Sequence, residues 1–188
     1  MDIEFFFDVG SPYSYFAATR IDAIGHRAGL PVRWRPFLLG GVFRSVGNHP
    51  PAMLPARAPY LFKDLQRWAD HYEEPFAFPS TFPMNTLLAM RALTAVPEAG
   101  RAEAALALFR AYWADNQDLT RPEVIARMLG EAPVVAAVSP DIKAQLRATT
   151  DEAVERGAFG APTVFIGEEM FFGNDRLHFV EAYAQSLA

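Results

Sequence analysis

Apolar residues form an almost continuous run near the start of the chain. The run covers residues 3–7, Ile-Glu-Phe-Phe-Phe, and is short and aromatic, as expected of a strand buried on both faces. Between residues 13 and 27 the apolar positions recur at helical spacing, and Gly29 followed by Pro31 is a common helix stop. Residues 32–36 alternate apolar and basic side chains, which indicates a second strand. The opening therefore predicts a β-α-β unit with parallel strands.

The middle of the chain is predicted to be helical after a long loop. Glycine and proline are frequent between residues 37 and 59, so we expect an ordered loop without regular structure there. Four helical patterns follow, at residues 58–72, 85–95, 102–115 and 121–129. The sequence Thr-Arg-Pro-Glu resembles a helix start with Thr120 as its N-cap.

The last third of the chain returns to strands. A helix is predicted over residues 141–156, with Ser139 as its cap. Residues 162–166 and 170–172 are β-branched or aromatic and enclose a hairpin-like turn. A closing helix is predicted over residues 177–187.

These elements predict a mixed α/β fold that is divided along the sequence. The β-α-β unit at the start and the α-β-β-α unit at the end are expected to form one domain, at residues 1–40 and 135–188. An all-helical inserted domain, residues 41–134, is expected to separate its two parts.

Composition narrows the classes of function. The 188 residues carry a formal net charge of −5 without a basic run, which gives no electrostatic reason to bind nucleic acid or an anionic membrane surface. Cysteine is absent, so there is no disulfide, no cysteine zinc site and no redox pair of the protein's own. The histidines lack the spacing of metal ligands. No apolar run approaches the roughly 20 residues that span a bilayer, and the acidic start is unlike a signal peptide, so a cytoplasmic protein is expected.

Ser11 is the first candidate for chemistry. It follows the first predicted strand and precedes Pro12, which suits the first position of a helix because its missing N–H needs no partner. On this pattern alone Ser11 is an N-cap, which contributes about 1 kcal/mol. A hydroxyl has two acceptor lone pairs and one donor, so the same side chain can cap the helix and donate to an anion. The helix N-terminus adds unpaired N–H groups and about half a positive charge.

Motifs along the whole chain resemble one family. The first is Phe-Phe-Asp-x-x-Ser-Pro-Tyr-Ser-Tyr, residues 6–15. The others follow in family order at residues 47–51, 55–68, 82–86, 89–93, 157–163 and 172–177. This ordered set resembles the 2-hydroxychromene-2-carboxylate isomerases, which are relatives of the kappa-class glutathione transferases. The resemblance implies a thioredoxin-like domain with a helical insertion.

The resemblance also implies that glutathione supplies the thiol that this chain lacks. Ser11 then stands where disulfide oxidoreductases of the superfamily carry their attacking cysteine. Lowering the pKa of a thiol from about 8.5 by about 1.5 units requires roughly 2 kcal/mol. One serine hydrogen bond to an anion, together with a helix terminus, is of that size. We therefore expect Ser11 to stabilise the thiolate of glutathione as the catalytic residue.

Six further positions are implied to bind glutathione. They are Asn48, Arg57, Ala161, Pro162, Asn174 and Asp175. The Ala161-Pro162 bond is expected to be cis, with the backbone of Ala161 pairing to glutathione, although on sequence alone Pro162 simply opens a strand. Asn174 and Asp175 are expected at the γ-glutamyl end, and both also suit a helix cap. Arg57 stands where relatives usually carry lysine, which keeps the charge but changes the contact geometry.

Four positions are expected to face an aromatic substrate. They are Pro12, Tyr13, Phe37 and Asn85. Asn85 equally suits the N-cap of the following helix. Either Arg35 or Lys63 is expected to meet a substrate carboxylate, and the spacing does not choose between them.

Other conspicuous side chains are expected to be structural. Trp34, Trp68 and Trp113 are predicted to lie in the core. Asp64 and Arg67 lie one helical turn apart and are predicted to form a solvated or structural pair.

The activity implied by the resemblance is a glutathione-dependent cis-trans isomerisation. By that analogy, 2-hydroxychromene-2-carboxylate or a related compound is converted to trans-o-hydroxybenzylidenepyruvate through addition of the thiolate, bond rotation and elimination. Two alternatives stay open: a kappa-like glutathione transferase, which consumes glutathione, and a non-catalytic thioredoxin-like binding protein. The expected partners are glutathione, a small aromatic substrate and a second copy in a homodimer, without nucleic acid or membrane.

Overall fold

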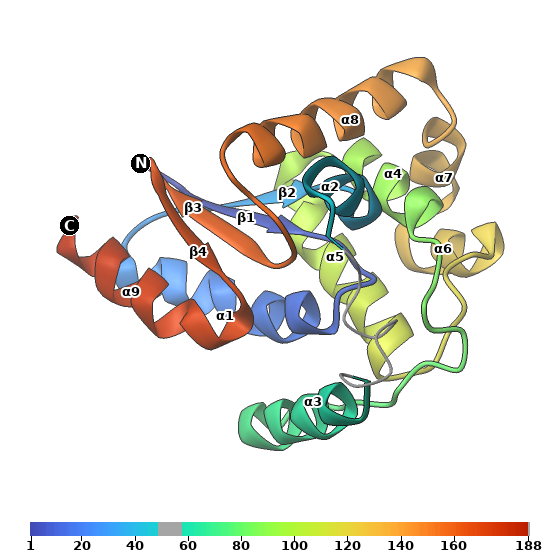
Figure 1. Cartoon of the computed structure of the whole chain (residues 1–188). Helices are drawn as coiled ribbons and strands as arrows, with labels where there is room; N and C mark the ends of the chain where they lie inside the picture. Colours follow the sequence, from blue (N-terminus) through green and yellow to red (C-terminus); the bar gives the residue numbers. More distant parts are fainter. Residues whose placement is uncertain (49–57, 188) are drawn as a thin grey trace.

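A four-stranded mixed sheet lies at the centre of the structure (Figure 1). The computed structural model describes residues 1–48 and 58–187. The strands are β1 (Ile3–Phe7), β2 (Val32–Pro36), β3 (Thr163–Ile166) and β4 (Glu169–Phe172), in the order β2-β1-β3-β4. Strand β1 runs parallel to β2 and antiparallel to β3, which pairs antiparallel with β4. The predicted β-α-β opening and closing hairpin are therefore confirmed.

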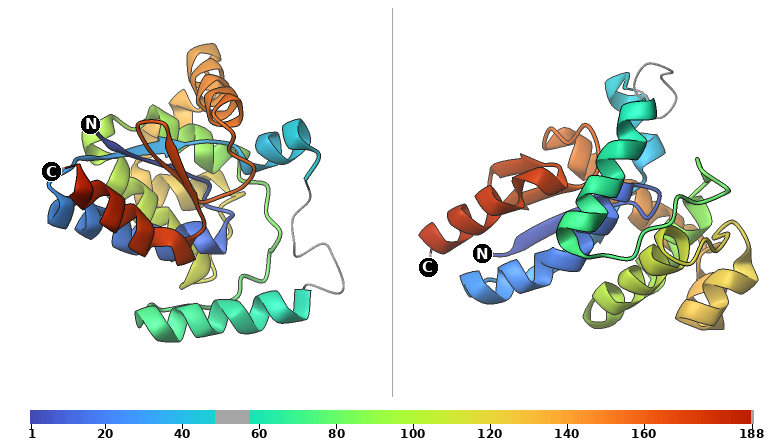
Figure 2. Two further views of the ribbon diagram at one scale, coloured as in Figure 1. Left: turned by 60° about the vertical axis from the view of Figure 1, so that its left-hand side comes forward. Right: turned by 90° about the horizontal axis from the view of Figure 1, so that it is seen from below.

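Helices cover both faces of the sheet (Figures 1 and 2). Helices α1 (Pro12–Ala28) and α9 (Leu177–Ser186) pack against each other on one face, and α8 (Pro140–Glu155) lies on the other. The remaining elements are α2 (Leu39–Val46), α3 (Ala58–Tyr72), α4 (Leu87–Ala95), α5 (Glu98–Trp113), α6 (Pro122–Leu129), α7 (Glu131–Ala136) and the 3-10 turn η2 (Asn174–Arg176). None of the helices within the described residues is long and apolar enough to cross a membrane.

The segment after β2 departs from the sequence prediction. A loop without regular structure was expected, but α2 forms there and ends at Gly47, whose φ is 69°. A Cβ on Gly41 would lie 3.1 Å from Cγ2 of Thr150 in α8, so this glycine permits close packing of the two helices. Of the glycines that favoured a loop, Gly41 therefore serves helix packing and Gly47 ends the helix. The rest of the predicted loop, residues 49–57, lies outside the described residues.

Two other helix predictions need correction. Helix α7 was not predicted. Thr120 does not cap α6, because the N-cap is Arg121 and makes no side-chain cap bond, while the Thr120 hydroxyl donates to Asp118 Oδ1 at 2.6 Å. The predicted cap at Ser139 is confirmed, since its Oγ accepts from the backbone N–H of Ile142 at 3.3 Å.

An aromatic core connects the sheet to the helices that follow it. Phe7, Trp34 and Trp113 are buried in one cluster that extends from β1 and α1 to α4 and α5. Trp113 Nε1 donates to the backbone carbonyl of Val9 at 2.8 Å, which ties the end of α5 to the turn before Ser11. The core positions of Trp34 and Trp113 are confirmed. The division into domains at residues 1–40 with 135–188 and at residues 41–134 stays a prediction.

Candidate active site

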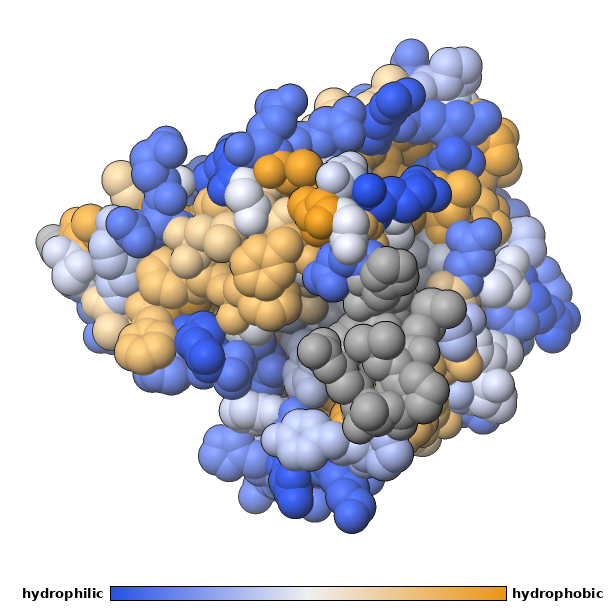
Figure 3. Space-filling view, in the orientation of Figure 1, coloured by the Kyte–Doolittle hydropathy of each residue, from blue (hydrophilic) through white to orange (hydrophobic). Residues whose placement is uncertain are grey.

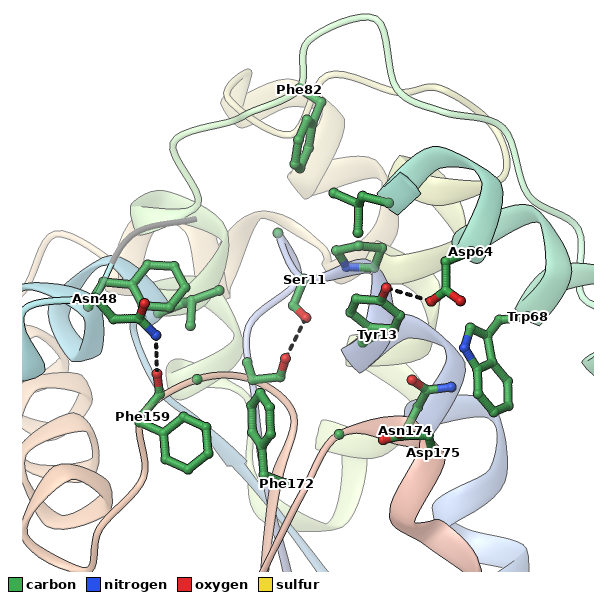
Figure 4. Close-up of a pocket in the computed structure, with 18 residues that line it drawn as sticks. Ser11, Tyr13, Asn48, Asp64, Trp68, Phe82, Phe159, Phe172, Asn174 and Asp175 are labelled. Carbon is green, nitrogen blue, oxygen red and sulfur yellow. Dashed lines mark hydrogen bonds between the residues drawn. The ribbon is translucent and has the colours of Figure 1, made fainter. Parts of the chain in front are cut away.

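Ser11 lies in a pocket at the ends of the central strands (Figure 4). The cavity has a volume of about 440 Å³ and is lined from the β1–α1 turn, α2, α3, the segment before β3 and the start of η2. Many of the predicted site residues come together here. They are Ser11, Pro12, Tyr13, Asn48, Ala161, Asn174 and Asp175.

The hydroxyl of Ser11 is both a helix cap and a hydrogen-bond donor. Ser11 is 3% exposed. Its Oγ accepts from the backbone N–H of Ser14 at 3.1 Å, which confirms the predicted N-cap, and donates to the carbonyl oxygen of Ala161 at 2.9 Å. Because a hydroxyl has one proton, Ser11 can donate to a bound anion only when its O–H turns away from Ala161. The cap on Ser14 can be kept during that change.

The segment facing Ser11 contains a cis peptide bond. The Ala161-Pro162 bond is cis, as the resemblance implied. Ala161 lines the pocket, whereas Pro162 is buried and its carbonyl accepts from the N–H of Gly173 at 3.0 Å. On the opposite side of the pocket mouth, Asn48 Nδ2 donates to the carbonyl of Phe159 at 3.3 Å. The segment before β3 is thus attached to Ser11, to Asn48 and to η2.

Asn174 brings a buried donor to the pocket. Its side chain is 2% exposed, and Nδ2 has no hydrogen-bond partner within the described residues. A buried amide N–H left without an acceptor costs about 1–3 kcal/mol, so an oxygen of a ligand would stabilise this position. The adjacent Asp175 is half-exposed and pairs with Arg176. Neither Asn174 nor Asp175 caps α9, whose N-cap is Arg176.

Helix α3 supplies a carboxylate that the sequence interpretation assigned to a surface pair. Asp64 lines the pocket, and its Oδ2 accepts from the Tyr13 hydroxyl at 2.7 Å. Burial raises the pKa of Tyr13, and the hydrogen bond to Asp64 raises it further. The phenol therefore stays protonated, with its proton directed at Asp64. No ion pair joins Asp64 to Arg67 in the part of the chain that the structure describes, so that predicted pairing is not observed.

Trp68 also belongs to the pocket. It packs partly against the core, as predicted, but it is half-buried and its other side lines the cavity near Asp64 (Figure 4). Leu61, Asp64 and Trp68 are spaced three and four residues apart, so they lie on one face of α3. That spacing was the available signal for this wall.

Several predicted positions lie elsewhere. Phe37 is fully buried in a cluster with Phe6 and Phe165 and does not line the pocket. Asn85 is exposed, and its Oδ1 accepts from the N–H of Leu87 at 3.0 Å at the start of α4.

The basic candidates are likewise not brought into the pocket. Arg35 is paired with Glu4 and Glu152, and Lys63 does not line the cavity. Arg57 lies outside the described residues, so its role stays a prediction.

Asp8 was not predicted as a site residue, although its carboxylate supports the turn before Ser11. It is 1% exposed. Its carboxylate accepts from Gly10 N at 2.9 Å, from Leu39 N at 2.8 Å and from the Thr86 hydroxyl at 3.1 Å. Burial raises the pKa of Asp8, and these hydrogen bonds oppose that rise. One buried carboxylate therefore fixes the turn before Ser11, the start of α2 and the start of α4.

Known proteins resemble the chain over nearly its whole length. The family model for a DSBA-like thioredoxin domain matches residues 2–185. A 2-hydroxychromene-2-carboxylate isomerase of Sphingobium xenophagum is 31% identical over 193 residues, which cover 96% of this chain and 96% of that protein. Glutathione S-transferase kappa 1 of Homo sapiens is 32% identical over 197 residues, which cover 93% of this chain and 87% of that protein.

A solved structure of a 2-hydroxychromene-2-carboxylate isomerase has the same fold. It matches with a TM-score of 0.88 and 31% identity, covering 100% of this chain and 96% of that chain. The mixed sheet and its helices are thus arranged as in that protein.

Proposed function

We propose that the chain is a glutathione-dependent isomerase of 2-hydroxychromene-2-carboxylate or a related aromatic compound. The chain belongs to the family of DSBA-like thioredoxin domains. Within that family it belongs to the group of 2-hydroxychromene-2-carboxylate isomerases and kappa glutathione transferases. Relatives named as isomerases match it almost from end to end, so the chain is an enzyme of the isomerase type. The observation that carries the proposal is the buried Ser11 hydroxyl at the N-terminus of α1, inside the pocket.

The pocket fits glutathione in size and in polar groups. Its volume of about 440 Å³ lies in the range of small-molecule sites. The unpaired Asn174 Nδ2 suits an acceptor such as the γ-glutamyl carboxylate, and Asp175 beside it suits the ammonium group. Ala161 and Asn48 offer backbone and amide groups at the opposite end. When bound, glutathione supplies a thiolate nucleophile.

Ser11 stabilises that sulfur as a thiolate. Its O–H turns from the Ala161 carbonyl to the sulfur and keeps its cap on Ser14. The N-terminus of α1 adds an oriented positive potential, which requires no rearrangement during the reaction. Pro12, Tyr13 and the half-buried Trp68 then provide an apolar wall for an aromatic substrate.

The same site supports a kappa-type transferase as the second candidate, because the human kappa 1 transferase is as similar to the chain as the isomerases are. The two reactions differ in the fate of glutathione. An isomerase returns it, so substrate turnover far exceeds the glutathione supplied; a transferase consumes one glutathione for each product. A non-catalytic binding protein would convert no aromatic substrate and consume no glutathione. A homodimer stays a prediction.

The decisive experiment follows the thiolate absorbance of bound glutathione against pH. We expect the bound thiol to titrate below the ordinary pKa of about 8.5. Ser11→Ala should retain most of the glutathione affinity but raise that pKa by about one unit. Ser14→Ala is the matched control, because the Ser14 hydroxyl is buried without a hydrogen-bond partner in the described residues. Equal titration curves in the native protein and Ser11→Ala would remove Ser11 from the mechanism.

A further inference from the structure

A second cleft lies behind the Ser11 pocket, on the other side of α2. Leu39 and Phe43 of this helix line the Ser11 pocket, whereas Leu38, Gly41 and Arg44 line the second cleft. The cleft has a volume of about 650 Å³, and its walls come from α2, α4 and α8. It is therefore large enough for a small organic molecule.

The floor of the cleft is firmly built. Thr150 of α8 is 6% exposed, and its Oγ1 accepts from the N–H of Leu38 at 2.9 Å and donates to the carbonyl of Leu146 at 2.7 Å. Leu146 is 3% exposed. The close approach at Gly41 described above holds α2 against the same turn of α8. Leu38, Leu146 and Leu87 of α4 give the cleft an apolar part beside the Thr150 side chain.

The rim of the cleft is strongly cationic. Arg44, Arg91, Lys143 and Arg147 line it, against a single carboxylate, Asp151. That carboxylate lies 3.7 Å from Arg147 on the exposed surface of α8, a pair that contributes little. Figure 3 shows that the surface over α8 is mainly hydrophilic.

Three of these cations have side chains without a partner among the described residues. No hydrogen bond or ion pair there engages the side chain of Arg44, Arg91 or Lys143. Most arginines elsewhere are paired with carboxylates or carbonyls. They include Arg20, Arg27, Arg33, Arg35, Arg101, Arg121 and Arg156. Since the whole chain carries a net charge of −5, unpaired cations from three separate helices in one cleft are a local exception.

We propose that this cleft binds a small organic dianion, a phosphate monoester or a dicarboxylate, with an apolar body. Repulsion among the cations is relieved when an anion lies between them. The half-buried Arg91 offers a planar fork of N–H donors to phosphate or carboxylate oxygens, and Lys143 adds a point charge. The apolar body packs on Leu38, Leu87 and Leu146. The site is separate from the Ser11 pocket and does not depend on the function proposed above.

Calorimetric titration at constant ionic strength tests the site. The probes are phenyl phosphate, terephthalate and neutral benzyl alcohol. Comparing the first two probes decides whether the site prefers a phosphate monoester or a dicarboxylate. We expect saturable binding of at least one dianion and none of the alcohol. The double variant Arg91→Gln with Lys143→Gln should weaken the affinity for the dianion about tenfold or more. Both side chains lie on the rim, so the fold should be retained, which circular dichroism checks.

Lys63→Gln with Arg67→Gln is the matched control. Like the cleft variant, it removes one arginine and one lysine charge, but from exposed positions on α3 outside the cleft. The proposal expects this variant to bind the dianion with unchanged affinity. Loss of binding in the α3 variant rather than in the cleft variant would move the anion toward the Ser11 pocket and overturn the proposal. Equal affinity in all three proteins, or no saturable binding of either dianion, would overturn it as well.

Discussion

The two walls of the Ser11 pocket are built in different ways. The wall at the sheet consists of Ser11, Ala161 and Asn174, which are 3%, 9% and 2% exposed. The wall from α3 presents Asp64 and Trp68, which are both half-buried. Helix α3 lies apart from most other helices and makes its main helix contact with α1 (Figures 1 and 2).

This difference indicates that one wall positions the reacting groups and the other recognises the substrate. Hydrogen bonds to Ser14 and Ala161 hold Ser11, and Asp8 holds the turn before it, so the position of the Ser11 Oγ is fixed even though its O–H can turn. Reactions depend on such accuracy of position. The α3 wall is attached to the other helices chiefly through α1, and regions with few tertiary contacts open with little free energy. We therefore expect changes in the sheet wall to affect stability and chemistry, and changes in α3 to affect which substrates bind.

The largest effect is expected when the support of the sheet wall is removed. Asp8→Ala leaves one buried donor, at Thr86, and two part-buried donors, at Gly10 and Leu39, without their acceptor. We expect the free energy of unfolding to fall by about 3 kcal/mol, measured by urea denaturation. Asp70→Ala is the control, because the Asp70 side chain is exposed on α3 and, among the described residues, accepts only from Gln66 in the same helix. Equal losses in the two variants would show that Asp8 is no special support.

A smaller and different effect is expected on the α3 wall. Asp64→Ala removes the acceptor of the Tyr13 hydroxyl and one polar side of the pocket. Because the reacting groups are on the other wall, KM for the aromatic substrate should rise about tenfold while kcat changes less than about threefold. The free energy of unfolding should fall by about 1 kcal/mol. A loss in kcat with an unchanged KM would place Asp64 with the chemistry and end the distinction between the walls.

The two walls also differed in how well the sequence predicted them. Ser11 was predicted from the strand and helix that flank it, whereas Ala161 and Asn174 were expected from the family resemblance. All three stand where a strand meets a turn, and parallel and antiparallel pairing brings such ends together. Asp64 and Trp68 lie inside a helix, and helical spacing shows that they share a face but not what the face contacts. Their place in the pocket depends on how α3 docks on α1, which no local pattern determines.

Long-range contacts explain the remaining differences. Asp8 ends an apolar strand and gains its role only from Leu39 and Thr86, which are far along the chain. Phe37 follows a strand, and on which side of the sheet it is buried depends on the second cluster around Phe6. The helix α2 formed despite two glycines because tertiary packing against Thr150 outweighs their low helix propensity.

The smallest expected effect is a dependence of stability on pH that comes from Asp8. Burial raises the pKa of Asp8 in the folded chain, whereas in the unfolded chain it titrates near 3.8. Between these two values the folded state binds more protons than the unfolded state, so stability falls as pH rises through that window and is constant above it. Asp8→Asn loses one hydrogen bond at every pH but has no proton to release. The difference in melting temperature between the native protein and Asp8→Asn should therefore shrink as pH rises above about 4 and then stay constant, because all other carboxylates are common to both. A difference that grows with pH would mean that the three hydrogen bonds outweigh burial and that Asp8 is held as a stabilised anion behind Ser11.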